Sequence, residues 1–499
     1  MKMDSGSRFF PDTKTFGALV GGIACGLIVL ILLGLPKKWL VGVFGGFSIL
    51  LFALFSSKAR PALLVFLIIS ILVNFDFHLT YVPGYIGISD GIAIGNFQVS
   101  LMLLVLLALF GPKSERPDRI RFFPQTTIPF LILVIAGIFS FVNSSDRTLS
   151  FYGLLNWVGA FVFYFYMANN LKTAKELKLV LLAMQIGILI QGGVCIVQAM
   201  LKTNFTLNFQ VFGQDPYSTV FRSGGLTGSP NYAGAYIAGI IPITFAQLLI
   251  MDNKREKLFA FVALLIGTVG MLLTFSRATW VALFLALLPT SFLLMKQRLL
   301  KFRHLAWALL PVFVLILVFQ EAILSRVGEG SENLDNRANL FTTAVNMISA
   351  HPLLGIGINT YTHQMAAFTV REMYYHWDYM VHNKYLHLWS ETGIFGLLSF
   401  VTIALVAAVA AFRLTRKHDR IIAAIGTGIF GAILMYAIHM NFETYGTDLN
   451  QYWLMVALTV ALGVLGYSAP DQKQKRELSH PIANEPKPKR ATRIKNVRR

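Results

Sequence analysis

The sequence predicts an all-α integral membrane protein, a multi-span bundle of about 12–14 transmembrane helices with one large extracytoplasmic loop that carries short helices. Three observations support this fold class. Of the 499 residues, 55% are hydrophobic and only 13% are charged, whereas about a quarter of the residues in a soluble domain are charged. Apolar runs long enough to cross a bilayer recur along the whole chain. Between two of these runs, the long segment 325–390 holds five of the ten histidines.

Fourteen apolar runs approach the length of a transmembrane helix, which is about 20 residues. They cover residues 16–36, 39–55, 61–75, 97–111, 128–143, 149–168, 179–201, 231–250, 258–275, 279–295, 305–324, 392–412, 421–441 and 451–468. The third, fourth and fifth runs are short, so twelve or thirteen spans also fit the sequence. The first run begins the series and has no small-residue cleavage pattern, so we do not expect a cleavable signal peptide.

The distribution of Lys and Arg predicts which side each connection faces, because these residues accumulate in cytoplasmic loops. With the N-terminus inside, the cytoplasmic connections and both tails hold 33 of the 43 basic residues, and the outer connections hold the other ten. We therefore predict a cytoplasmic N-terminal segment 1–15, a polytopic membrane domain 16–468 and a basic cytoplasmic tail 469–499.

The net charge of +19 does not indicate a nucleic acid partner, because most of the excess lies on the cytoplasmic side of a membrane protein. The tail 469–499 is rich in Lys, Arg and Pro and has no apolar period. We predict that it is disordered and contacts anionic lipid headgroups. The lipid bilayer is thus the expected partner of these charges, and no nucleic acid is expected.

Neither cysteine pattern nor acid spacing indicates a metal or a cofactor. Cys25 and Cys195 both lie inside apolar runs, which predicts no disulfide framework and no zinc site. Asp, Glu and His residues at metal-ligand spacing are also absent from the predicted outer loops. The polar chemistry of the outer face is therefore arginine together with histidine.

Three arginines stand out in the predicted outer segments. Arg222 lies in a glycine-containing approach to a span, Arg277 in a short polar break between two runs, and Arg337 at the expected start of a loop helix. An arginine at the bilayer centre costs roughly 2.5–3.5 kcal/mol on insertion scales and by default marks a functional interior. Because guanidinium binds phosphate oxygens through paired hydrogen bonds, these residues predict a pyrophosphate site. The alternative is that Arg277 caps a tight hairpin and the other two are surface residues.

The large outer loop, residues 325–390, is rich in Trp, Tyr, Met and Leu, so we expect it to fold and pack on the membrane surface. Amphipathic helices are predicted near 336–350 and 359–372, separated by the breaker His-Pro-Leu-Leu-Gly-Ile-Gly at 351–357. A histidine in an exposed loop is usually only a loop residue. His382 and His387 are five residues apart, so they do not share one helical face as an i,i+4 pair does.

The end of this loop contains the pattern His-Asn-x9-Gly-x-x-Gly, formed by His382, Asn383, Gly393 and Gly396. It resembles the motif of the O-antigen ligase and polymerase superfamily of bacterial polysaccharide assembly.

Three further pieces are similar to the same family in order and spacing. They are Arg222 followed by Ser-Pro-Asn at 229–231, the turn that contains Arg277, and Arg337 upstream of the breaker. The resemblance covers about residues 220–400, and earlier residues resemble the family only as a series of spans.

This resemblance implies a metal-independent, inverting glycosyltransferase in the bacterial cytoplasmic membrane. Its donor would be a glycan on undecaprenyl pyrophosphate, and its acceptor a hydroxyl of a glycan or of a lipid-anchored acceptor at the outer face. His382 would be the general base, because an unperturbed imidazole pKa near 6.5 suits proton transfer at neutral pH. Arg222, Arg277 and Arg337 would bind the pyrophosphate and stabilise the charge that develops on the leaving group.

The remaining motif residues would support this site. Asn383, Gly393 and Gly396 would hold the end of the loop and permit close helix packing, without a chemical role. Glu391 and Asp378 are the acids that could orient His382, and the sequence does not choose between them.

The acceptor stays open between an O-antigen ligase and a polymerase of exopolysaccharide, capsule or teichuronic-type glycan, with other polysaccharide-assembly proteins as further partners. The alternative from another class is a transporter or flippase for lipid-linked sugars. That class predicts internal repeats and ionisable residues at mid-membrane, whereas here these residues cluster at outer ends and in one loop. A scaffold or sensor would leave the order of the arginines unexplained.

Overall fold

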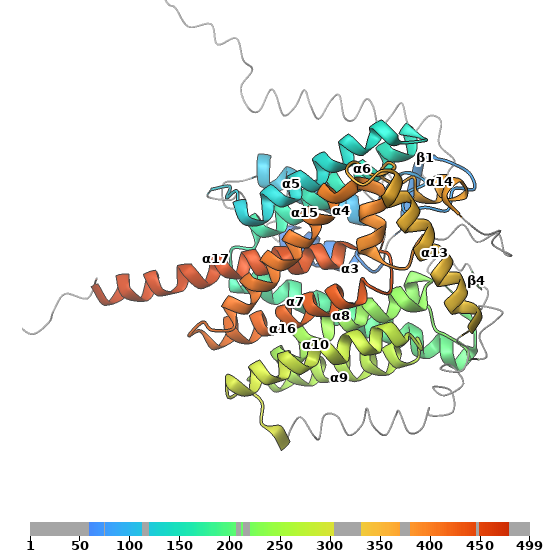
Figure 1. Cartoon of the computed structure of the whole chain (residues 1–499). Helices are drawn as coiled ribbons and strands as arrows, with labels where there is room; N and C mark the ends of the chain where they lie inside the picture. Colours follow the sequence, from blue (N-terminus) through green and yellow to red (C-terminus); the bar gives the residue numbers. More distant parts are fainter. Residues whose placement is uncertain are drawn as a thin grey trace, which may run out of the picture.

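The computed structural model describes most of the chain as a bundle of helices (Figure 1). The described residues are 59–73, 75–111, 119–205, 211–212, 220–303, 331–369, 380–445 and 449–478. The predicted spans 16–36, 39–55 and 305–324 lie outside these residues, as does Asp378.

The helices follow the predicted apolar runs closely. They are α3 (Ala59–Ile69), α4 (Asn96–Phe110), α5 (Pro124–Phe139), α6 (Arg147–Asn170), α7 (Ala174–Leu201), α8 (Pro230–Leu248), α9 (Lys254–Leu272), α10 (Arg277–Lys296), α13 (Ser331–Ala350), α14 (Tyr361–Phe368), α15 (Lys384–Leu414), α16 (Arg420–His439) and α17 (Asn450–Leu478). Among the described residues, six helices are long and apolar enough to cross a membrane, α5 being extended to Asn143 by a 3-10 turn. The predicted all-α membrane bundle is confirmed.

Polar residues fix where several of these helices begin. The side chains of Asp146, Thr173, Asn253 and Asp419 accept hydrogen bonds from backbone N–H groups in the first turns of α6, α7, α9 and α16. Such caps satisfy N–H groups that have no partner inside the helix. The helix boundaries therefore follow from short polar signals between the apolar runs.

Three helices form the middle of the bundle. In Figure 1, α15, α16 and α17 lie between α5 and α6 on one side and α8, α9 and α10 on the other. The closest packing is of α16 against α8 and α10, of α15 against α5, and of α17 against α6. Two thirds of the apolar window of α16 is buried, compared with one third for α15. Because α16 packs on both α8 and α15, the connection between α16 and α17 lies close to the N-terminal ends of α8 and α15.

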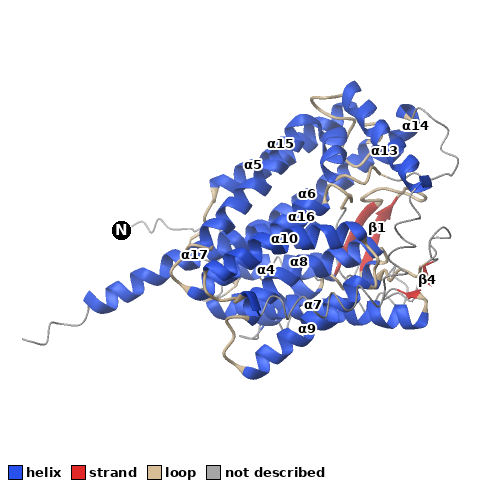
Figure 2. Cartoon of the chain, turned by 60° about the horizontal axis from the view of Figure 1, so that its bottom comes forward, coloured by secondary structure: helices blue, strands red, loops and turns tan. Residues whose placement is uncertain are grey.

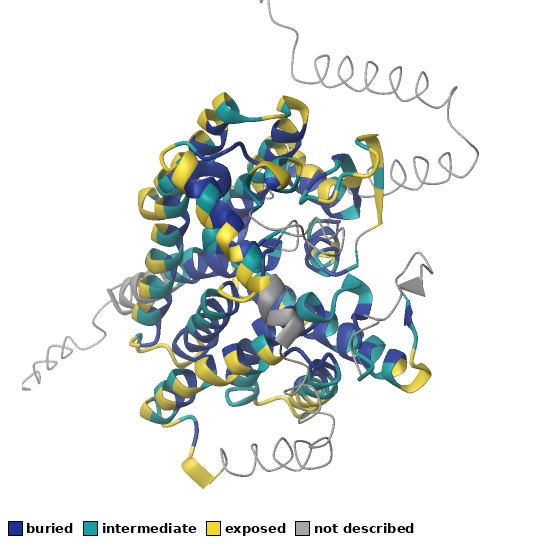
Figure 3. Ribbon diagram, turned by 45° about the vertical axis from the view of Figure 1, so that its right-hand side comes forward, coloured by how far each residue is buried: buried dark blue, intermediate teal, exposed yellow. Residues whose placement is uncertain are grey.

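Large apolar side chains remain exposed on the outward faces of the bundle (Figure 3). Phe284 and Phe292 on α10, Phe261 on α9 and Leu405 on α15 are each more than half exposed. Soluble monomers rarely expose large contiguous apolar patches, whereas lipid tails cover such surfaces. The burial pattern therefore agrees with a multi-pass membrane protein.

The connections gather at two opposite ends of the bundle. At one end, Arg60 pairs with Glu176 at 2.7 Å and Lys178 with Glu256 at 2.7 Å. These contacts join connections that were predicted to be cytoplasmic. The other end carries the β-strands, α13 and α14 (Figure 1), where Asn143 donates to the Gly355 carbonyl at 2.8 Å. The structure therefore groups the connections at the same two ends as the distribution of Lys and Arg did. Which of these ends faces the cytoplasm stays a prediction.

Two of the apolar runs that the sequence analysis noted as short correspond to short helices. α3 has 11 residues and α4 has 15, whereas a perpendicular crossing needs roughly 17–25. The interval between them contains an antiparallel hairpin of β1 (Asp76–Tyr81) and β2 (Gly91–Gly95) (Figure 2). A second, minimal pair joins β3 (Asn204–Phe205) to β4 (Val211–Phe212). The sequence analysis did not predict these strands, although β1 alternates apolar and polar residues as a strand does.

The last helix continues into the tail that was predicted to be disordered. α17 runs to Leu478, so the helix extends past the predicted end of the span at residue 468. Residues 471–478, which read Asp-Gln-Lys-Gln-Lys-Arg-Glu-Leu, are mostly strong helix formers and extend the helix. The rest of the tail, 479–499, lies outside the described residues.

Candidate functional site

A chain of hydrogen bonds at the strand-bearing end connects Arg222 to His382. Arg222 Nη2 donates to Asn231 Oδ1 at 2.9 Å, and Asn231 Nδ2 donates to Glu443 Oε2 at 2.6 Å. The other carboxylate oxygen, Glu443 Oε1, lies 3.1 Å from His382 Nδ1. Residues that are widely separated in the sequence thus form one continuous arginine–amide–carboxylate–imidazole network, which we call the Arg–His network.

Arg222 is positioned by buried amides from α7 and β3. Gln198 bonds both the N–H and the carbonyl of Gly225, at 2.7 and 3.0 Å, and Asn204 Nδ2 donates to the Arg222 carbonyl at 3.0 Å. The guanidinium also donates from Nε to the Thr274 carbonyl at 3.2 Å. The loop before α8 is therefore held on both sides, and the Arg222 side chain has a defined direction.

The turn before α10 joins the same network through a hydroxyl. Ser276 Oγ donates to Asn231 Oδ1 at 3.0 Å, and Thr279 Oγ1 donates to Ser276 Oγ at 2.9 Å. Arg277 follows directly as the first residue of α10, and it is exposed. Its place at a helix N-terminus adds the positive end of the helix dipole to the guanidinium charge, which favours anions there.

His382 is held just before α15. Asn383 caps that helix, because its Oδ1 accepts from the N–H groups of Tyr385 and Leu386 at 3.0 Å each. The His382 side chain is 31% exposed, whereas its partner Glu443 is 7% exposed. One side of the imidazole is therefore fixed by a buried acid, and the other side is accessible from the end of the bundle.

Glu443 lies in the connection between α16 and α17 and remains ionised. Burial alone would raise the pKa of this carboxyl, but the hydrogen bond and charge of His382 and the hydrogen bond from Asn231 outweigh burial and lower it. Because the shift is downward, the carboxylate persists at neutral pH, and protonation would remove its interaction with His382 only in acid.

The structure does not bring every predicted residue into this network. Arg337 is exposed on α13, and within the described residues no hydrogen bond connects it to His382. Glu391 is buried and accepts from the Tyr361 N–H at 3.2 Å, at the start of α14. Among the described contacts His382 pairs with Glu443 and not with Glu391, so the structure does not support Glu391 as the acid that orients His382. Glu443 takes that place.

A break in α15 docks the two loop motifs onto each other. Gly393 has φ 67° and ψ −173° inside the helix, so the carbonyls of Ser390 and Glu391 are free to accept from Ile356 and Gly357, at 2.8 and 3.1 Å. These partners belong to the breaker 351–357. The glycine of the motif therefore fastens the loop that carries α13 and α14 to the helix that carries His382.

Replacing Gly393 with alanine should destabilise this end of the protein strongly. A Cβ there would lie 1.9 Å from the Leu353 carbonyl oxygen, and its φ and ψ fall in a region that is essentially restricted to glycine, at about 1–3 kcal/mol for other residues. We expect a clearly lower Tm in thermal unfolding of the detergent-purified protein. Gly193→Ala on α7 is the matched control, since a Cβ there meets no atom within 4 Å. Equal Tm values for the two variants would contradict this role of Gly393.

Part of the chain that carries this site matches a known protein family. Residues 260–401 match the O-antigen ligase family. The match confirms the resemblance inferred from the motifs, and at a general level it supports a membrane glycan ligase or polymerase. A search among curated proteins finds no match.

The segment that matches the O-antigen ligase family runs from within α9 to within α15. It contains Arg277, Arg337, His382 and Gly393. Arg222 and Glu443 lie outside it, and the fold brings both to its edge through Asn231. The Arg–His network therefore extends the family segment with residues from α8 and from the connection between α16 and α17.

Sequence reasoning missed Glu443 as the partner of His382 and gave Asn231 no role of its own. The only signal for Glu443 was an acid directly after an apolar run, in a short connection without a recognisable motif. Among the described residues, no group of three or more His, Cys, Asp or Glu side chains could hold a metal ion. The Arg–His network itself supplies guanidinium, imidazole, carboxylate and amide groups.

Proposed function

We propose that the protein is a membrane glycosyltransferase that transfers or polymerises glycan from an undecaprenyl-pyrophosphate-linked donor onto an acceptor hydroxyl at the outer face of the bacterial cytoplasmic membrane. The observation that carries the proposal is the Arg–His network, which joins an anion-binding group to a general base at one end of the bundle. The O-antigen ligase match of residues 260–401 supports the reaction class.

His382 acts as the general base in this proposal. With Glu443 accepting a hydrogen bond from Nδ1–H, the lone pair of the imidazole is on Nε2. Nε2 takes the proton of the acceptor hydroxyl as its oxygen bonds to the anomeric carbon of the donor. The bond from that carbon to the pyrophosphate oxygen breaks, and undecaprenyl pyrophosphate leaves with the electron pair. Attack opposite to the leaving group inverts the anomeric centre.

The arginines act on the leaving group. Arg222 is fixed by Asn231 and by the Thr274 carbonyl, and Arg277 lies at the N-terminus of α10. Both place positive charge where the pyrophosphate gains negative charge as the bond breaks, which lowers the barrier. Arg337 contributes from α13, which packs on α15. No step requires a metal or another cofactor.

The acceptor divides the proposal into two related activities. An O-antigen ligase would use a lipid-anchored acceptor such as lipid A–core, and a polymerase of exopolysaccharide, capsule or teichuronic-type glycan would use another repeat unit. Both use the same chemistry at the anomeric carbon, so the Arg–His network serves either one. Other polysaccharide-assembly proteins are expected to supply the donor.

The leaflet in which lipid-linked glycan accumulates tests the proposal. A strain that lacks this protein should collect undecaprenyl-pyrophosphate-linked glycan on the outer leaflet, where added periodate or lectin reaches it in intact spheroplasts. The purified protein in liposomes should then convert that material to transferred or longer glycan with release of undecaprenyl pyrophosphate. Accumulation on the inner leaflet, with no transfer in liposomes, would instead identify a flippase.

A further inference from the structure

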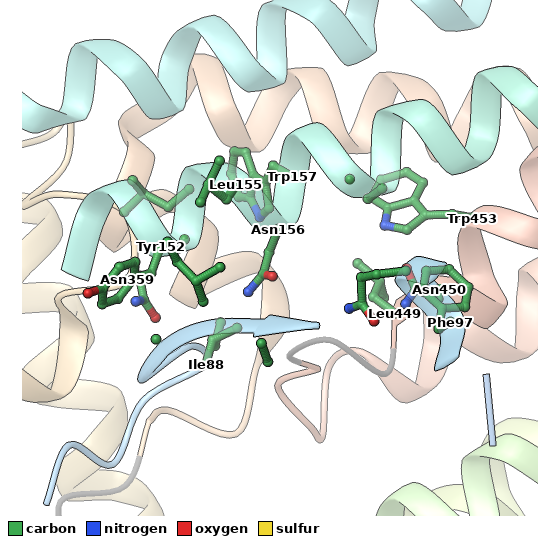
Figure 4. A pocket seen from close by; sticks show the side chains of 18 of the residues that line it. Ile88, Phe97, Tyr152, Leu155, Asn156, Trp157, Asn359, Leu449, Asn450 and Trp453 are labelled. Atoms are coloured by element: carbon green, nitrogen blue, oxygen red, sulfur yellow. The ribbon is translucent and has the colours of Figure 1, made fainter. Parts of the chain in front are cut away.

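A separate cavity lies between α6, α4 and β2 (Figure 4). It has a volume of about 220 Å³ and is lined by α4, α6, α15, α17, the turn of the hairpin with β2, and the connection before α14. Figure 4 shows Asn156 reaching from α6 into the space beside the hairpin strand, with Asn450 and Trp453 lining the cavity farther along. None of the three predicted arginines lines this cavity, and neither does His382.

The lining combines aromatic rings with amide and charged groups. Trp157 and Trp453 line the cavity together with Asn156 and Asn450, and Lys384 and Glu391 contribute from α15. The Nδ2 group of Asn156 is buried and has no hydrogen-bond partner among the described residues. Native proteins rarely leave such a donor unsatisfied, and an exception requires an explanation. A ligand with hydroxyl oxygens would supply the missing acceptor.

The cavity shares a wall with the Arg–His network. Lys384 is two residues beyond His382, its Nζ donates to the Tyr445 carbonyl at 2.8 Å, and its side chain lines the cavity. Glu443 is two residues before Tyr445. Lys384 therefore borders the cavity and also contacts the connection that carries Glu443, so the cavity and the Arg–His network share this part of the protein.

We propose that this cavity binds a sugar ring of the acceptor glycan. The inference rests on the proposed function, in which the acceptor oxygen attacks from the side opposite to the pyrophosphate. None of the arginines proposed to hold the donor pyrophosphate lines the cavity, so we assign the cavity to the acceptor. Tryptophan faces pack against the C–H face of a sugar, and amides and carboxylates bond its hydroxyls. At about 220 Å³ the cavity is smaller than pockets for drug-sized ligands, roughly 300–1,000 Å³, which suits one ring.

The lining favours a sugar over a lipid chain or a second phosphate. An acyl or prenyl chain would leave the buried Asn156 Nδ2 donor without an acceptor, which is unfavourable. A phosphate would meet the Glu391 side chain, and the one lysine already donates to Tyr445. A neutral polyhydroxyl ring satisfies donors and acceptors alike.

Two substitutions test the cavity. Gly159 lines it, and a Cβ there meets no atom within 4 Å, so Gly159→Phe fills the space from α6. Asn156→Leu keeps a similar volume and removes the unsatisfied amide. Gly193→Phe on α7 is the matched control, because that helical glycine also has open space and does not line the cavity.

The probe is the free repeat-unit oligosaccharide, released by mild acid from the lipid-linked glycan of the deletion strain, so that it carries no pyrophosphate. Calorimetric titration into the full-length protein in detergent measures its binding. Both cavity variants should bind it at least about tenfold more weakly, because a pocket buries most of its ligand, while binding of undecaprenyl pyrophosphate stays unchanged. Gly193→Phe should bind both as the wild type does.

Binding and turnover separate this inference from the proposed function. The His382→Ala protein should still bind the oligosaccharide. If the wild type binds the oligosaccharide but does not transfer glycan, only the proposed function is refuted. Wild-type affinity in both cavity variants, or no binding by the wild type, would overturn the cavity assignment alone. If the two cavity variants had a raised KM for the lipid-linked donor and an unchanged KM for the acceptor, the cavity would bind the donor sugar, and the acceptor assignment would be refuted.

Discussion

Replacing His382 with alanine is expected to abolish glycan transfer while protein level and membrane insertion stay normal. The imidazole is partly exposed and its Nδ1 lies 3.1 Å from Glu443, so its loss removes the proposed base without emptying a buried core. General-base catalysis contributes about 10²–10⁴-fold to a rate. We expect kcat to fall by about that factor, measured as the rate of glycan transfer by purified protein in liposomes.

Two other substitutions make this result specific. His363→Ala removes an exposed histidine of α14 that bonds only the Ser145 hydroxyl at 2.8 Å among the described contacts, and it should leave transfer unchanged. Glu443→Gln keeps the shape of the His382 partner but removes its charge, so it should give a smaller loss of kcat and a changed pH–rate profile. Wild-type transfer by His382→Ala would eliminate the imidazole as the base.

Replacing Arg222 with alanine is expected to lower transfer by about 10²–10³-fold, the usual effect of removing one preorganised group that stabilises transition-state charge. Lysine should restore only part of the loss. The guanidinium reaches the Thr274 carbonyl through Nε and Asn231 Oδ1 through Nη2 at the same time. A single ammonium group cannot reproduce this planar arrangement.

The measurement for Arg222 has to separate binding from folding. Affinity for undecaprenyl pyrophosphate should fall in Arg222→Ala, and Tm is measured on the same sample to report stability. Arg147→Ala is the matched control, because Arg147 is an exposed arginine at the same end of the bundle, at the start of α6. Unchanged pyrophosphate affinity and unchanged transfer in Arg222→Ala would remove this residue from the site.

The sequence predicted the helical bundle well because a membrane crossing requires a long apolar run, and such runs are readable without any tertiary information. It also located the breaker 351–357 and the helices on either side, where glycine and proline interrupt a periodic pattern. It was less successful with α3, which ends at Ile69 although its apolar run continues to residue 75, whereas α4 matches the length of its run. The length of an apolar run does not determine where the hydrogen-bonded helix ends.

The residues of the candidate site that belong to a sequence motif could be predicted. The residues that only the folding of the chain brings to the site could not. His382, Arg222 and Arg277 follow from residue type and order. Glu443 does not, because its meaning depends on the connection after α16 returning to His382. Arg337 shows the converse. Its position in the sequence predicted that it would join the other two arginines, but the described contacts do not connect it to the Arg–His network. A pairing between distant loops is a property of the packing, and a single sequence does not display it.

The break at Gly393 divides α15 into two helical segments with different surroundings. The segment before Gly393 is bonded to the breaker through the Ser390 and Glu391 carbonyls, whereas the segment after it exposes large apolar side chains such as Phe395 and Leu405. A helix adapts to bilayer thickness by tilting, and an unbroken helix would transmit that tilt to its end. We expect that the interrupted hydrogen bonding at Gly393 lets the second segment tilt while the spacing between His382 and Glu443 is preserved.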